Sequence, residues 1–400
     1  MKQRIFIAIA CVVVAAVILL SLPPAHPVTQ PTIPLPSLNK PTQPTVPTTL
    51  PDPGVVRLYS CDIAWVMALR ELAAQYTELT GTEVTVLSPA TGEDCQTALA
   101  AYMDSDEPPT AFCFHTQSQM EAWQNYLLPL EDTPLADTLY SADFGLTVGD
   151  HTLALPMDME AFGLLFNANL LGSKGSYTRD DITDLAGLTT AVQILKNNST
   201  KAFPVGTMSD DDALRLLSGG DSGDILAFLN LYINNCNSSG EEWDRFLNGK
   251  SVFCLGTTAD YDLVAQQTNK VLKVRNLDIL PTFSAGAMQY FCTTAWGING
   301  CLRQEDVDVT VEFLSWLFTA SEESDAPVDQ LQSLTPFADA DWYGNPLEKK
   351  LLGYMKTEPA VIGWKVDVQP EDPILVALNA YLTTPGDETW SALLALLETT

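Results

Sequence analysis

Residues 55–114 alternate between two hydrophobic patterns, and this alternation constrains the fold more than any other feature of the chain. Apolar runs typical of buried strands are separated by stretches whose apolar residues recur at helical spacing. The predicted strands are 55–59, 83–87 and 110–114, and the predicted helices are 65–79 and 91–103. Gly81 is a typical helix stop after the first helix. This order predicts a parallel sheet with helices on both faces.

Ligands of such sheets bind beyond the carboxyl ends of the strands. In this chain those ends are Ser60–Asp62 and His115–Gln117. Further strands are predicted at 151–156 and 162–166. The remaining predicted helices are 185–197, 210–217, 224–234, 240–247, 307–320, 374–383 and 388–398. Several of them begin with acidic residues, which favour the N-terminal end of a helix dipole.

The charge of the chain excludes some partners. It has 20 Lys and Arg against 50 Asp and Glu, a formal net charge of −30, and residues 55–400 alone carry −32. Such a surface repels phosphate backbones, so no nucleic-acid partner is expected. Because 46% of the residues are hydrophobic and only 18% are charged, 400 residues predict two or three folded units with a sizeable core.

The first 54 residues lie outside that core. Lys2 and Arg4 precede an apolar run at 5–22. This pattern predicts a membrane anchor or signal segment at 1–22, with the N-terminus on the cytoplasmic side of the membrane. An uncleaved anchor is favoured; ordinary cleavage and lipidation at Cys11 remain alternatives, giving a secreted or a lipid-anchored protein. Residues 23–54 are a Pro/Thr-rich linker, with 11 prolines between 23 and 53, and predict an extended stalk.

Seven further cysteines follow the stalk, and no two of them have the spacing of a zinc finger. Cys292 and Cys301 are nine residues apart, which would suit a disulfide across a strand-turn-strand, although buried thiols are the alternative. With three histidines in the chain, no metal site and no cofactor are predicted.

Three short motifs look catalytic but lack the rest of their machinery. Residues 220–223 match the Gly-Asp-Ser-Gly of serine proteases without a suitable histidine and acid, and a helix cap at Asp221 or Ser222 explains them better. Residues 249–251 lack the first glycine of a P-loop, and 339–350 lack the closing glutamate of a calcium loop. The chain is therefore not predicted to be an enzyme.

The carboxylates of Asp158 and Glu160 are the strongest remaining catalytic candidates. They lie two residues apart on a predicted strand and so face the same side. A glycosidase needs two opposed carboxylates on different elements. Glycoside hydrolysis therefore stays an alternative of low weight, because a chain with 50 acidic residues offers many such pairs by chance.

A series of segments in fixed order resembles the bacterial extracellular solute-binding proteins of ABC importers, in particular their family 1 branch of maltodextrin-binding-like carbohydrate receptors. The segments resemble the family's first helix with its Thr-Gly turn, its interlobe crossing, its F-x-x-G-K signature and its returning strands. They are Leu72–Val86, Ala98–Phe112, Tyr126–Glu131, Leu155–Leu171, Phe246–Gly256, Asp278–Phe283 and Trp296–Asn299.

The resemblance implies an α/β, two-lobed periplasmic-binding-protein-like fold of type II, each lobe a mixed sheet flanked by helices, behind the N-terminal membrane helix and stalk. The implied first lobe is 55–157 with 281–325, and the second is 158–280 with 326–400. Closure of the lobes around a solute would be a hinge motion. The implied function is to capture a small polar solute, most plausibly a sugar, in the interlobe cleft and deliver it to permease subunits at the extracellular face.

The resemblance also implies a set of ligand-binding residues at strand ends and crossings. They are Ser60, Cys61, Asp62, Trp65, His115, Thr116, Gln117, Asp158, Glu160, Thr207, Ser209, Thr258, Asp260, Tyr261, Trp296, Trp342, Tyr343 and Trp364. Thr258 stands where many sugar binders have tryptophan, which argues against a long maltodextrin. A sensor or adhesion ectodomain on the same fold is the alternative function.

Overall fold

The computed structural model describes residues 54–398 except 207, 238–240, 268–269, 322–323, 342–344, 357–359, 366–368 and 370–371. The predicted anchor and all of the predicted stalk before Gly54 lie outside the described residues. Among the described residues, no helix is both long enough and apolar enough to cross a bilayer.

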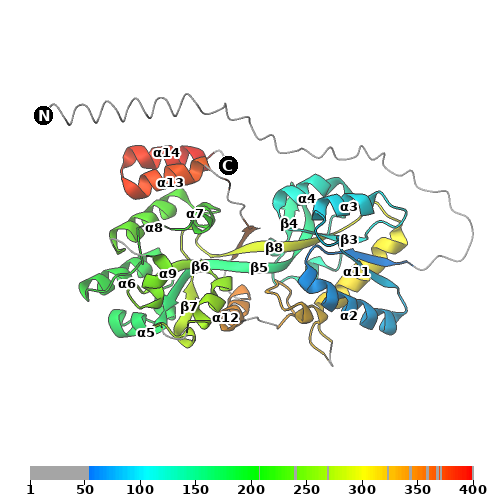
Figure 1. Ribbon diagram of the computed structural model, residues 1–400, viewed down its shortest axis with the longest axis horizontal. Helices are drawn as coiled ribbons and strands as arrows, with labels where there is room; N and C mark the ends of the chain where they lie inside the picture. The colour runs from blue at the N-terminus through cyan, green and yellow to red at the C-terminus, as the bar shows by residue number, and fades with distance from the viewer. Residues whose placement is uncertain are drawn as a thin grey trace, which may run out of the picture. The chain divides into compact units, whose positions relative to one another are not determined.

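The described strands form one nine-stranded mixed sheet, ordered β2-β1-β3-β8-β5-β4, with β6 and β7 also paired to β5 and β9 paired to β8 (Figure 1). The strands are β1 Val56–Tyr59, β2 Val84–Leu87, β3 Ala111–Phe114, β4 Leu146–Val148, β5 His151–Asn167, β6 Phe253–Thr257, β7 Leu277–Leu280, β8 Met288–Ile298 and β9 Ala360–Trp364.

Helices surround this sheet. They are α2 Ile63–Thr80, α3 Cys95–Met103, α4 Gln117–Trp123, α5 Ala168–Leu170, α6 Leu185–Asn197, α7 Asp210–Leu217, α8 Ser222–Asn234, α9 Glu242–Leu247, α10 Tyr261–Ala265, α11 Gln304–Phe318, α12 Pro346–Met355, α13 Pro373–Thr383 and α14 Asp387–Leu397. Most predicted helices are confirmed to within a few residues. α3 begins at Cys95 and not near 91, because Asp94 caps it by accepting from the Thr97 N–H at 2.9 Å.

The predicted β-α-β-α-β unit is confirmed, with β1 parallel to both β2 and β3. The sequence of α2 explains its bounds. Asp62 caps its start, and Gly81 ends it with a φ of +79°, a backbone conformation that favours glycine. Its buried face includes Trp65, Leu69 and Leu72, which follow the helical period.

β5 and β8 are the two long strands of the sheet, and they lie antiparallel to each other. The far end of β8 pairs with β3, and the far end of β5 pairs with β6 and β7 (Figure 1). The β5–β8 pair therefore joins two groups of elements. The β1–β3 group consists of β1, β2, β3, α2, α3, α4 and α11. The β6–β7 group consists of β6, β7 and α6 to α9. The sequence analysis divides β5 into two strands, whereas the structure extends it through Pro156.

The 3-10 turn at Pro327–Leu331 contacts α2 and α11 of the β1–β3 group. The suggested disulfide between Cys292 and Cys301 is wrong, because both are free thiols. β8 runs extended from Cys292 to Ile298, which separates the two cysteines by on the order of 20 Å and not by a tight turn.

Candidate functional site

The turn between β1 and α2 lies at the predicted ligand edge. Ser60 is fully buried, and its Oγ accepts from the Asp62 N–H at 3.2 Å. One carboxylate oxygen of Asp62 accepts from the Ala64 N–H at 3.0 Å, which caps α2. Ser60 therefore holds the turn in place, whereas Asp62 is partly exposed and has a second carboxylate oxygen available for a ligand.

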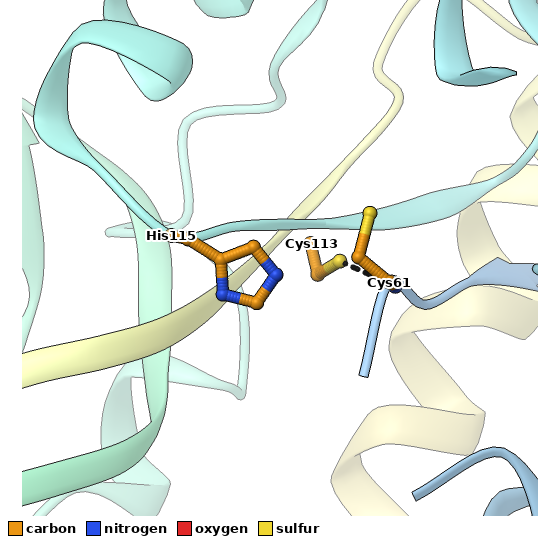
Figure 2. A group of neighbouring side chains, drawn as sticks. All are labelled: Cys61, Cys113 and His115. Carbon is orange, nitrogen blue, oxygen red and sulfur yellow. Dashed lines mark hydrogen bonds between the residues drawn. The ribbon is translucent and has the colours of Figure 1, made fainter. Parts of the chain in front are cut away.

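Cys61 lies in the same turn, and its contacts reach the neighbouring strand. Its backbone N–H donates to the Sγ of Cys113 on β3 at 3.1 Å, and its own thiol lies 3.7 Å from the Tyr59 hydroxyl. The hydrogen bond with the Cys113 side chain, together with burial, raises the pKa of the Cys61 thiol well above its usual range. The sulfurs of Cys61 and Cys113 and a ring nitrogen of His115 lie within 4.8 Å of one another (Figure 2).

His115 directly follows β3 and is held from two sides. Its Nδ1 lies 3.1 Å from the backbone oxygen of Thr293 and 3.3 Å from the Thr294 hydroxyl, both on β8. The Cys61 side chain raises the pKa of the imidazole despite its burial. The next two predicted residues belong to α4: Thr116 caps it by accepting from the Gln119 N–H at 3.3 Å, and Gln117 is exposed.

Asp158 lies on β5 at an irregularity in its pairing with β8, a place where a strand can redirect a side chain. The Thr293 hydroxyl donates to its Oδ2 at 2.5 Å. Burial, with a smaller contribution from the charges of Glu160 and Asp62, raises the pKa of Asp158 to about 6. Thr293 therefore contacts both Asp158 and His115, and joins the crossing strand to the strand-end residues.

Glu160, two residues further along β5, lies between two cations. Its carboxylate is 3.1 Å from the Arg215 guanidinium and 3.7 Å from the Lys365 ammonium. Arg215 is almost fully buried on α7, and its guanidinium lies over the Phe291 ring. The sequence analysis missed both cations. The signal for Arg215 was a single charge within the apolar run Ala213–Leu217, at a position where the helix faces the core.

The predicted residues of the β6–β7 group lie at the starts of short helices. Ser209 caps α7 by accepting from the Asp212 N–H at 3.1 Å. Thr258 is buried, and its Oγ1 accepts from the Ala161 N–H of β5 at 3.2 Å. Asp260 accepts from the Thr257 N–H at 2.8 Å, and burial raises its pKa. Tyr261 is half-buried at the start of α10.

The predicted aromatic residues have different surroundings. Trp65 is 7% exposed and Trp296 is 2% exposed, and both pack in the main hydrophobic core. The indole Nε1 of Trp296 is buried with no hydrogen-bond partner among the described residues. Trp364 is half-buried at the end of β9. Thr207, Trp342 and Tyr343 lie outside the described residues.

The structure thus brings one subset of the predicted residues close to the crossing strands: Cys61, Asp62, His115, Asp158, Glu160 and Asp260. The negative charges of Asp62 and Glu160 each contribute to the raised pKa of Asp158. The charge of Glu160 also contributes to the raised pKa of Asp260. Carboxylates and an imidazole are suited to hydrogen-bonding a polar, hydroxyl-bearing solute. A surface hollow of about 450 Å³ lies elsewhere, around α9 and Val271, and no predicted site residue lines it.

Comparison with known families decides the class of protein. Residues 71–340 match the family described as bacterial extracellular solute-binding protein. The chain belongs to this family. The match covers well over half of the solute-binding chain and includes β5, β8 and the end of β3 at His115, whereas the end of β1 precedes it.

Solved structures share the fold of this solute-binding protein at low sequence identity. The bacterial solute receptor AcbH, reported to prefer β-D-galactopyranose exclusively, has a TM-score of 0.63 and 14% identity, over 87% of this chain and 98% of that chain. RafE from Streptococcus pneumoniae without ligand has a TM-score of 0.63 and 12% identity, with the same coverage. A family 1 extracellular solute-binding protein from Bifidobacterium longum subsp. infantis has a TM-score of 0.60 and 13% identity, covering 87% and 100%.

These likenesses identify the mixed α/β architecture of two-lobed solute-binding proteins. A comparison with curated proteins returned no significant relative. The family and these neighbours are binding proteins and not enzymes.

Proposed function

We propose that this protein captures a small polar solute, a sugar, between two lobes and delivers it to an ABC importer at the outer face of a bacterial membrane. The observation that carries the proposal is the family match across residues 71–340, which includes the polar groups at the end of β3 and on β5. On this account the chain has no enzymatic activity.

The choice of a sugar has two supports. Two structural neighbours are sugar binders: AcbH prefers β-D-galactopyranose, and RafE has been solved with raffinose. The candidate site also offers several carboxylates, of which Asp158 and Asp260 have raised pKa values because of burial. Partly buried carboxyl groups that accept or donate hydrogen bonds suit the hydroxyls of a sugar.

The proposed lobes remain 55–157 with 281–325 and 158–280 with 326–400, except that Pro327–Leu331 contacts α2 and α11 and so belongs with the first lobe. β5 and β8 would then be the crossing segments that bend on closure. Asp62 would contribute from the first lobe, Asp260 and Tyr261 from the second, and Asp158 and Glu160 from the crossing.

A thermal-shift panel tests the proposal. The full chain is heated with galactose, raffinose or maltose, and in parallel with amino acids and spermidine as other classes of small solute. Ligand at about 100 times its Kd adds roughly 2.7 kcal/mol to stability, which raises Tm by several degrees. A shift with a sugar alone supports the proposal. A shift only with spermidine or an amino acid, or with none of the solutes, contradicts it.

We also propose that residues 1–22 anchor the protein and that residues 23–54 hold it away from the membrane. The positive charge before an apolar run supports this orientation. The test is fractionation of cells that express the full chain, a chain lacking residues 1–22, and Cys11→Ser. Membrane attachment that survives Cys11→Ser and is lost on truncation supports the anchor. Attachment lost in Cys11→Ser indicates a lipid tether instead.

A further inference from the structure

Two cysteines and a histidine gather at the predicted ligand edge of the sheet. Cys61 follows β1, Cys113 lies within β3 and His115 follows β3, so two adjacent parallel strands supply all three side chains. Figure 2 shows the His115 ring beside Cys113, with Cys61 next to Cys113. Their donor atoms lie within 4.8 Å of one another, and Cys113 is fully buried.

We propose that Cys61, Cys113 and His115 form a metal site that binds one Zn²⁺ ion. This goes beyond the capture of a sugar, since it gives the protein a second ligand of different chemistry. Thiolate sulfur and imidazole nitrogen are the preferred donors for zinc. The sequence analysis predicts no metal site because Cys61 and Cys113 are 52 residues apart, and only the pairing of β1 with β3 brings them together.

Hydrogen bonds hold the ligands of the cluster in place. The Cys61 backbone N–H donates to the Cys113 sulfur at 3.1 Å, which fixes that sulfur beside Cys61. The backbone oxygen of Thr293 is an acceptor only and lies 3.1 Å from the His115 Nδ1, so this nitrogen carries the proton. The lone pair is then on Nε2, and Figure 2 shows the second ring nitrogen on the side of the two cysteines.

The distances fit zinc after small side-chain movements. Zn–S bonds of about 2.3 Å and Zn–N bonds of about 2.0 Å in a tetrahedron place neighbouring ligand atoms roughly 3.5–3.8 Å apart. The atoms that now lie within 4.8 Å must therefore approach by at most about 1.3 Å. Cys61 is only half-buried, at the margin of the hydrophobic core, where a side-chain movement displaces fewer neighbours than it would at the fully buried Cys113.

The fourth position is open to water, as in zinc sites that are not purely structural. The Cys95 thiol neighbours that of Cys61 and supplies a further sulfur beside the cluster. Asp62 and Asp158 are close enough to act on the same region through their charges, which favours a cation there.

The test is a Zn²⁺ titration of the full chain, purified with a reductant and stripped of metal by a chelator. Wild type should bind one Zn²⁺ per chain, and Cys61→Ser and His115→Gln should each weaken binding at least tenfold. Cys301→Ser and His151→Gln change an exposed cysteine and an exposed histidine outside the cluster, and should leave binding unchanged.

Cobalt substitution gives a second readout that does not depend on the stability of one variant. Co²⁺ in wild type should show a sulfur-to-metal charge-transfer band, reduced in Cys61→Ser and retained in His115→Gln at saturating metal. Three results would overturn the site: no stoichiometric Zn²⁺ binding, equal affinity in wild type and both cluster variants, or a disulfide between Cys61 and Cys113 in protein purified with the reductant. Sugar binding is measured separately without metal, so failure of one proposal leaves the other intact.

Discussion

Glu242 is a partly buried carboxyl whose ionisation should weaken the folded state. It lies in the first turn of α9, where the fully buried Tyr232 donates to its Oε1 at 3.5 Å. Burial, and after it the charge of Asp212, raises the pKa of Glu242 from its ordinary value of 4.5 to about 8. Asp212 is itself nearly buried, and burial raises its pKa to about 6.

The sign of the pH effect follows from this difference. Between about pH 4.5 and about pH 8 the folded protein holds a proton on Glu242 that the unfolded chain has released. The free energy of unfolding therefore falls as pH rises through this window, by about 1.4 kcal/mol per pH unit for one group. The full window corresponds to at most about 5 kcal/mol, and we expect at least about 2 kcal/mol, since water entry and relaxation reduce such penalties.

Glu242→Gln removes this group, and Glu241→Gln is its matched control at the adjacent, exposed position. Urea unfolding at about pH 5 and about pH 8.5 gives the free energy of unfolding of each variant. Glu242→Gln should gain at least about 2 kcal/mol relative to wild type between the two pH values, and Glu241→Gln should follow wild type. The reasoning is refuted if both variants show the pH dependence of wild type.

Two further substitutions test contacts on the crossing strand. Within the described part of the chain, Arg215→Met leaves Glu160 paired with the more distant Lys365 alone, which should cost about 3–5 kcal/mol in urea unfolding. Adding Glu160→Gln should recover at least half of this loss, and no recovery would contradict the ion pair. In Gly163→Ala the new Cβ would lie 2.2 Å from the Leu280 backbone oxygen, so Tm should fall by an amount equivalent to about 1–3 kcal/mol. In Gly353→Ala the new Cβ would have no atom within 4 Å, so Tm should stay equal or rise. An equal fall of Tm in both variants would contradict the steric explanation.

Local patterns predicted much of the fold. The strands and helices between residues 55 and 114 follow from hydrophobic period, and Gly81 ends α2 because its φ is positive. The predicted cap at Asp221 is also confirmed, since its carboxylate accepts from two N–H groups at the start of α8. These features depend on residues a few positions apart, which a sequence shows directly.

Features that depend on long-range pairing were harder to predict. β5 continues through Pro156 because β8 pairs on both sides of this residue, whereas a proline usually marks the end of a strand. Arg215 is stabilised in the core by Glu160, 55 residues away. Trp65 and Trp296 are of the residue type that sugar sites use, but both lie in the hydrophobic core. The sequence alone could not show whether these tryptophans line a binding cleft or the core.

Calorimetric titration of the full chain, with the sugar that gives the largest thermal shift, tests the central claim most directly. The account predicts one sugar per chain. It also predicts at least tenfold weaker binding in Asp158→Asn, which keeps the shape of the side chain, and unchanged binding in Glu71→Gln on the exposed face of α2. Absence of binding heat with every sugar, or equal affinity in wild type and Asp158→Asn, would contradict it.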